Sequence, residues 1–182
     1  MHQGRMGEAG VSLRSALAIA REVGHRRLEG LALMTMGSLQ VHQGSPEEAC
    51  STYYSAIATL REVGDRRTEA IVTGNLGVMC RRVGRLDEAV SWYRAAMAIL
   101  REVGNRLGEG NTLLNVGATA VDRGQLEVAA TIYHQALALL REIRCRSDEA
   151  IVLGNLGEVF QATGRMNEAR VAYEAALVVQ RE

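Results

Sequence analysis

Apolar and small residues recur along this chain at helical spacing, and the whole pattern repeats every forty residues. Its clearest copy runs from Arg61 to Leu100, where Gly74-Asn75-Leu76-Gly77 precedes a second stripe built on Ala89 and Tyr93. The equivalent residues forty earlier, forty later and eighty later are Gly37, Ala49 and Tyr53; Gly117, Ala129 and Tyr133; and Gly157, Ala169 and Tyr173. A fixed period over the whole chain predicts a repeat array, in which each unit packs only on its neighbours.

Each forty-residue unit divides into two predicted helices. In the second unit the first helix is expected over about 66–82, with Asp65 as its N-cap, and the second over about 86–102. Gly84 separates the two, because glycine suits the left-handed residue that ends many helices. In the preceding unit, Ser45-Pro46-Glu47-Glu48 predicts a capping box in which Ser45 caps the helix and Glu48 closes the box.

The predicted organisation is all-α, with nine helices in one continuous repeat domain. Residues 1–20 match the second half of a unit, and full units are expected at 21–60, 61–100 and 101–140. Residues 141–182 hold a fourth unit and the start of a truncated fifth. Neither end looks like a capping repeat, so we expect a fragment of a longer array. We also expect it to self-associate through its uncapped ends, as a symmetric dimer rather than an open chain.

The first helix of each unit carries two neighbouring stripes. In the second unit the predicted packing face holds Val72, Leu76, Met79, Cys80 and Val83. One step round the helix, an outward stripe holds Ile71, Gly74, Asn75, Val78 and Arg82. Gly77 costs about 1 kcal/mol relative to Ala in mid-helix, so its recurrence predicts a close helix crossing. The second helix is expected to bury Ala89, Tyr93, Ala96 and Met97.

Composition excludes several classes of function. The chain has 47% apolar residues, 21 basic and 21 acidic residues, and therefore none of the basic excess of a nucleic-acid binder. It has no apolar run long enough for a membrane span and no secretory segment, so a cytoplasmic location is predicted. Its cysteines and histidines show no metal spacing. No nucleophile with a base, phosphate loop or paired carboxylates stands out, so we expect no enzyme, no cofactor and no metal.

Gly77, Ala89, Tyr93 and Ala96, with their equivalents, resemble the signature of the tetratricopeptide repeat. The unit is forty residues long here instead of about 34. This variety is similar to the Leu-Gly-Asn polarity adaptors and to the arrays of bacterial signalling ATPases and transcriptional regulators. The resemblance implies a right-handed α-solenoid, a superhelix whose first helices line a concave peptide-binding groove.

An amide ladder runs along the predicted groove. It consists of Asn75, Asn115 and Asn155, with Thr35 in the first unit. An Asn amide both donates to and accepts from a peptide backbone, and in the adaptors and kinesin light chains that the motif resembles, the equivalent Asn faces cargo peptide. The alternative is that these amides hydrogen-bond the next helix and stabilise the stack.

The ladder is not accompanied by the family's carboxylate clamp. Chaperone-binding members use an Asn three positions after the Asn75 site, together with basic residues, to hold a C-terminal carboxylate. Here those positions hold Ser38, Val78, Ala118 and Glu158. A clamp of this kind is therefore not expected.

The function predicted from these features is a protein-interaction scaffold that binds a partner peptide or helix in the groove. The predicted binding residues are Asn75, Asn115, Asn155, Thr35, Ile71, Val78, Arg82, Leu114, Ile151 and Glu158. The stripe favours a ligand anchored by apolar side chains and held along its backbone. The alternative is a regulatory or sensor segment of a larger bacterial signalling ATPase or transcriptional regulator, which would bind its own chain or a small inducer.

Three further features are expected to be structural. Arginine recurs three residues before glutamate, at Arg26 and Glu29 and their equivalents, which predicts ion pairs worth about 0.2–0.5 kcal/mol that staple neighbouring units. The Arg-Glu pairs at 21–22, 61–62, 101–102 and 141–142 are predicted to be solvated helix ends. Trp92, replaced by Ala172 and other residues elsewhere, is expected to be a single packing residue.

Overall fold

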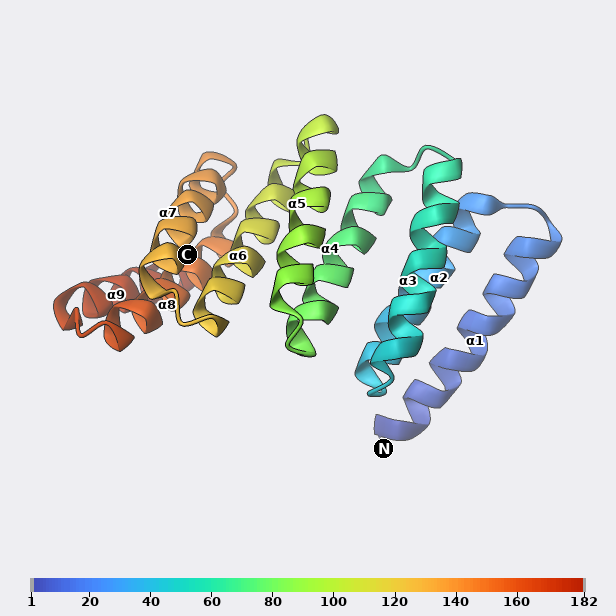
Figure 1. Ribbon diagram of the computed structural model, residues 1–182, viewed down its shortest axis with the longest axis horizontal. Coiled ribbons are helices and arrows are strands. Elements are labelled where there is room, and N and C mark those ends of the chain that lie inside the picture. The colour runs from blue at the N-terminus through green and yellow to red at the C-terminus, as the bar shows by residue number, and fades with distance from the viewer. Residues whose placement is uncertain (1, 182) are drawn as a thin grey trace. The chain divides into compact units, whose positions relative to one another are not determined.

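The computed structural model describes residues 2–181, and their side chains from residue 7 onward, as nine α-helices without a strand (Figure 1). The helices are α1 (His2–Glu22), α2 (Arg26–His42), α3 (Pro46–Glu62), α4 (Arg66–Arg82), α5 (Leu86–Glu102), α6 (Arg106–Asp122), α7 (Leu126–Glu142), α8 (Arg146–Ala162) and α9 (Met166–Arg181). The predicted all-α architecture of a repeat solenoid is confirmed, and α4 and α5 have the expected bounds. None of the described helices combines the length and apolar character that a membrane crossing needs.

Successive helices are joined through a residue in the left-handed conformation. Glycine holds this position between most helices, and Gly84 has a φ of +79° and Gly104 a φ of +64°. Between α7 and α8 the position is taken by Arg144, whose φ is 56°. A side chain in this conformation costs about 1–2 kcal/mol, because its Cβ crowds the following carbonyl oxygen. The fourth repeat therefore carries local strain that the others avoid.

The helix starts confirm one predicted cap and correct another. Asp65 caps α4 by accepting a hydrogen bond from the backbone N–H of Thr68 at 3.1 Å. The predicted capping box at Ser45 is wrong, because the Ser45 side chain makes no cap hydrogen bond. Glu48 instead accepts a hydrogen bond from the Gln40 amide of α2 at 3.5 Å, so the carboxylate that should close the box is directed elsewhere.

Above the level of the forty-residue repeats, the chain packs as two compact units. The first unit comprises residues 1–99 and the second unit residues 100–182, and they divide near the end of α5. In the first unit α2 pairs with α3, and α1 and α4 pack against this pair. In the second unit α6 pairs with α7 and α8 with α9, and α7 packs on α8. The core of the first unit includes Tyr53, Leu60, Val72 and Leu76. The core of the second includes the equivalent residues Tyr133, Leu140, Val152 and Leu156.

Burial along α4 and α5 follows the predicted stripes with one exception. Val72, Leu76, Met79 and Cys80 are buried, as are Ala89, Tyr93, Ala96 and Met97 on α5. Val83 does not belong to the packing face and is 42% exposed. It is the C-cap residue, where the chain leaves the helix and turns the side chain away from the buried stripe.

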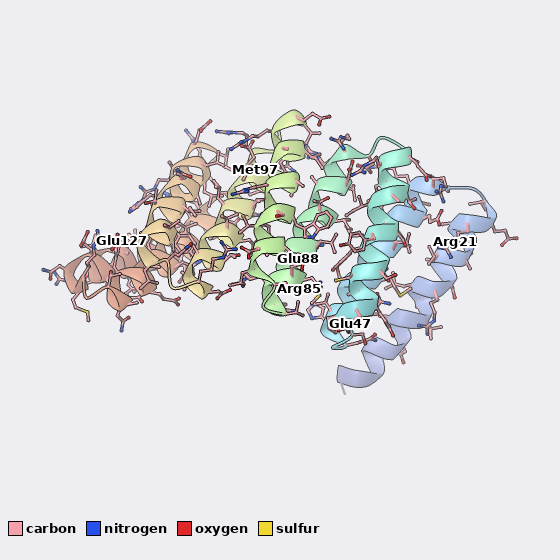
Figure 2. All side chains as sticks on the ribbon, in the orientation of Figure 1. Arg21, Glu47, Arg85, Glu88, Met97 and Glu127 are labelled. Atoms are coloured by element: carbon pink, nitrogen blue, oxygen red, sulfur yellow. The ribbon has the colours of Figure 1, made fainter. Side chains whose placement is uncertain are left out.

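Each of the helices α2, α4, α6 and α8, which begin a repeat, has a buried glutamate in its first turn. These residues are Glu29, Glu69, Glu109 and Glu149. Glu29 accepts from Arg26 at 2.6 Å, as predicted, and also from Arg21 at 2.8 Å. Figure 2 labels Arg21 on α1. Arg21 is exposed at the end of α1, as expected, and the ion pair with Glu29 is a contact that the sequence did not predict, formed because the tight turn folds the start of α2 back onto the end of α1. The hydrogen bond from Arg21 is the main cause that lowers the pKa of Glu29, and Arg26 adds to it.

The same arginines also link the two helices of a repeat, whereas the predicted staple between neighbouring repeats comes from Arg21 and its equivalents at Glu29, Glu69 and Glu149. Arg26 pairs with Glu62 at the end of α3, and Arg106 donates to Glu142 at the end of α7 at 2.9 Å. Each link joins the start of a first helix to the end of the following second helix. The recurring Arg and Glu residues therefore fix the junctions between helices.

Candidate functional site

The predicted outward stripe is accessible to a ligand in both units. Ile71 and Ile151 are 46% and 52% exposed, whereas Leu76 and Leu156 on the same helices are 1% exposed. Of the remaining predicted residues, three are exposed: Thr35, Arg82 and Glu158. The other five are half-buried: Asn75, Val78, Leu114, Asn115 and Asn155.

Three of the predicted residues meet around one hollow in the first unit. A cavity of about 220 Å³ lies between α2 and α4, and Asn75, Val78 and Arg82 line it from α4. Its other walls come from Ser38, Val41 and His42 of α2, Tyr53 of α3 and Met79 of α4. Apolar side chains, an amide and a cationic guanidinium therefore face the same space.

Tyr53 brings a polar group to this cavity from the buried side. Its ring packs over Gly37, and its hydroxyl lies 3.1 Å from the Ser38 hydroxyl. Burial raises the pKa of Tyr53 above its ordinary value, so the phenol is neutral throughout the physiological pH range, as tyrosines usually are. The Ser38 hydroxyl donates to the Met34 carbonyl at 3.2 Å, so the Tyr53 hydroxyl donates to Ser38 and both hydroxyl protons are used within the protein. The Arg82 guanidinium is the donor at this cavity for a carbonyl or carboxylate oxygen of a ligand.

Not all of the predicted residues join this cavity. Thr35 donates a hydrogen bond to the Leu31 carbonyl of its own helix at 2.9 Å, and Ile71 lies nearer the start of α4. In the second unit Leu114 and Asn115 lie on α6, and Ile151, Asn155 and Glu158 lie on the adjacent helix α8.

Asn115 bears on the structural alternative for the amide ladder. Its Nδ2 donates to the Asn111 carbonyl at 3.1 Å, which lies in the same helix, α6. The hydrogen bond that the structure describes for this amide therefore runs within α6 and not across to α8. The Oδ1 atom of Asn115 keeps its capacity to accept a hydrogen bond from a ligand.

The stripe carries opposite charge in the two units. Arg82 is the exposed basic residue of the stripe on α4. Its equivalent on α6 is Asp122, and Glu158 on α8 takes the place of Val78. The net charge near zero thus combines a basic residue of the stripe in the first unit with acidic ones in the second.

Sequence reasoning missed Val41, Tyr53 and Met79 as residues of the cavity. Val41 follows Ser38 at the helical spacing of three, which could have identified it. The position of Tyr53 in the repeat predicts a core residue. It does not reveal that the ring passes over Gly37 of α2 and that the hydroxyl reaches the cavity. Among the described residues no cluster of three or more His, Cys, Asp or Glu side chains could hold a metal ion.

Two family models described as tetratricopeptide repeat match the chain. One matches residues 30–102 and 68–142, and the other matches residues 117–182. No curated protein matches it.

Several solved structures share this fold at low sequence identity. BtubC (BKLC) from P. vanneervenii is 20% identical over 97% of this chain and 74% of its own, with a TM-score of 0.84. A putative kinesin light chain of Podosopora anserina with nearly identical TPR-like repeats is 16% identical, over 98% of this chain and 88% of its own, with a TM-score of 0.76. A Signal Transduction ATPase with Numerous Domains from Pyrococcus horikoshii, which has a tetratricopeptide repeat sensor, is 14% identical over 93% of this chain and 27% of its own, with a TM-score of 0.77.

Proposed function

This chain belongs to the tetratricopeptide repeat family, and from that premise we propose that it is a protein-interaction scaffold whose outward stripe binds a peptide segment or helix of a partner protein. The observation that carries the proposal is the cavity between α2 and α4. There Asn75, Val78 and Arg82, chosen from the sequence as groove residues, face Ser38 and Tyr53 across one space.

The chemistry of this surface suits a peptide in two ways. Val78, Val41 and Met79 offer an apolar wall for a side chain, while Asn75 can hydrogen-bond a backbone amide. Arg82 favours an acidic residue in a ligand that binds the first unit. We therefore propose a ligand with an apolar anchor and an acidic residue beside it.

A second candidate is a regulatory segment of a larger signalling protein, which would bind its own chain or a small inducer. The likeness to the sensor-bearing ATPase favours it, because this chain aligns with 27% of that protein's length. The coding sequence that flanks these residues discriminates the two candidates. A nucleotide-binding or helix-turn-helix domain in the same reading frame would favour the regulatory role.

The scaffold proposal is tested with peptides selected from a random displayed library on the immobilised protein. Their affinities are then measured by fluorescence anisotropy for the wild type and for the triple variant Asn75→Ala, Asn115→Ala, Asn155→Ala. A net hydrogen bond is worth about 1 kcal/mol, so losing three should weaken binding roughly a hundredfold. Far-ultraviolet circular dichroism should show unchanged helix content.

The matched control replaces three equivalent polar residues on the second helices, Ser51, Ser91 and Thr131, by Ala. All three are exposed, and none belongs to the stripe. This control should keep wild-type affinity. Full binding by the Asn variant, or unfolding of that variant, would show that the ladder has a structural role instead.

A further inference from the structure

A second, mostly apolar pocket lies in the second unit, as an open hollow between α7, α8 and α9, and it is separate from the outward stripe. Its volume is about 400 Å³. Buried Leu137, Leu153, Leu156, Phe160 and Ala172 line it, and the exposed residues His134 and Glu168 also border it. Pockets of this size bind small molecules when apolar walls surround a few polar groups.

The repeat itself shows what fills the equivalent space in the first unit. Eighty residues before Ala172 stands Trp92 of α5, and eighty before His134 stands Tyr54 of α3. The Trp92 and Tyr54 rings meet edge to face, with centroids 5.7 Å apart and an interplanar angle of 63°. Trp92 also packs against the core of the first unit. An indole from the chain itself therefore occupies this space between α3, α4 and α5.

In the second unit the indole is absent, and a different aromatic residue compensates in part. Ala172 replaces the Trp, while Phe160 of α8 replaces Cys80 of α4. Phe160 lies 6.1 Å from His134 between ring centroids, and the Arg165 guanidinium covers its ring at 4.4 Å. Leu153 also replaces Thr73, and Val171 replaces Ser91. The pocket borders Ala172, the position where the first unit holds the Trp92 indole.

We propose that this pocket is a binding site for a small, uncharged, planar aromatic ligand of the size of indole. The size and shape of the ligand are inferred from Trp92, whose indole occupies the equivalent space in the first unit. Phe160 and His134 supply ring contacts, and aromatic pairs favour each other beyond the area they bury. The ligand is uncharged because its surroundings are largely apolar, and the charged residues at the border are already paired, Glu168 with Arg165 and Arg141 with Glu149. His134 and the Asn167 amide at the border can accept a ring N–H.

The test titrates indole into the intact protein and follows backbone amide shifts by NMR. The wild type should show saturable shifts around His134, Phe160 and Ala172, with a Kd on the order of 0.1–1 mM for a ligand of about nine non-hydrogen atoms. Cyclohexanol, an aliphatic probe of similar size, should bind at least tenfold more weakly. No saturable shift with indole, or equal affinity for the two probes, would overturn the proposal.

Two variants that fill the pocket provide the decisive comparison. Ala172→Trp supplies the missing indole and should abolish binding, and Ala172→Leu fills less space and should weaken it at least tenfold. The smaller substitution remains informative if the larger one disturbs folding. Indole shifts that persist at wild-type affinity in a folded variant would contradict the assignment.

Two further variants test the equivalence of the two units and the independence of the two sites. Trp92→Ala should create a second set of indole shifts around Tyr54, and the absence of such shifts would refute the argument from Trp92. The triple Asn variant should bind indole as the wild type does, because none of its residues lines this pocket. Loss of indole binding there would mean that the two surfaces are not separate sites.

Discussion

The ring of Tyr93 on α5 lies against the backbone of α4 at Gly77, so closely that an added Cβ at Gly77 would stand 2.5 Å from the ring atom Cε1. The same contact recurs at the other crossings, where a Cβ at Gly37, Gly117 or Gly157 would lie 2.4–2.6 Å from the Cε1 atom of the equivalent tyrosine. The glycine therefore serves the packing of one particular ring in every repeat.

Replacing Gly77 by Leu should destabilise the protein far more than replacing Gly74 by Leu. A Cβ at Gly74 would lie 4.0 Å from the Cβ of Ala96, an ordinary contact, whereas Gly77→Leu displaces the Tyr93 ring. Overpacking of this kind costs about 1–3 kcal/mol. Urea unfolding followed by circular dichroism measures both variants. If both variants lost the same amount of stability, the packing face and the outward stripe of α4 would be assigned wrongly.

The strained left-handed residue Arg144 offers a stabilising substitution. Arg144→Gly removes about 1–2 kcal/mol of backbone strain but adds unfolded-state entropy, so the net gain should be about 0.5–1 kcal/mol. Gly104→Arg, at the equivalent junction one repeat earlier, is the matched control and should lose stability instead. Thermal melting compares the two. A lower melting temperature for Arg144→Gly would mean that the Arg side chain contributes more than its backbone strain costs.

The two helix caps should respond differently to alanine. Asp65→Ala removes the bond to the Thr68 N–H and the ion pair with Arg27, whose Nε lies 2.8 Å from Oδ2. This substitution should lower the free energy of unfolding by about 1 kcal/mol or slightly more. Ser45→Ala should cost only a few tenths of that, because the Ser45 side chain makes no cap hydrogen bond. Chemical denaturation tests the difference, and a large loss at Ser45 would indicate that the capping box forms in solution.

Glu149 should make stability depend on pH in the acid range. Burial alone would raise the pKa of Glu149, but hydrogen bonds from Arg141 and Arg146 outweigh it and lower the pKa below its ordinary value. Because the folded-state pKa is depressed, its stabilising contribution is complete above the unfolded value of about 4.3 and disappears as the pH falls through the folded value.

The substitution Glu149→Gln tests this dependence. It should lower the free energy of unfolding at pH 7, and the gap from the wild type should narrow below about pH 4. Urea denaturation at a series of pH values measures the gap, and NMR titration of the Glu149 carboxyl carbon reports its pKa directly. A gap that stays constant down to pH 3 would contradict the predicted direction.

Self-association through the chain ends remains a prediction, and α9 is the element to test. Leu177 and Val178 are 52% and 56% exposed on this helix, and burying one such side chain is worth about 1.5–3 kcal/mol. Sedimentation velocity should show a mass that rises with concentration, and Leu177→Ser with Val178→Ser should reverse the rise. A monomer at millimolar concentration would rule the association out.

The amino-acid sequence determined the helices of this protein and most of their buried faces. Its forty-residue period places Asp65 before α4 and Gly84 after it, so local chemistry defines the bounds of this helix. Spacing of three and four along α4 also separates buried Leu76 from accessible Asn75, because helix geometry requires neighbouring residues to point in different directions.

Only the tertiary structure decided which side chains from different helices share one space. The Tyr53 hydroxyl reaches Ser38 because the ring crosses over Gly37, and Glu29 gains Arg21 because the turn folds α2 back onto α1. The pocket beside Ala172 likewise depends on how α7, α8 and α9 pack around it. Such relationships depend on packing distances between helices, and the spacing of residues along one helix does not contain them.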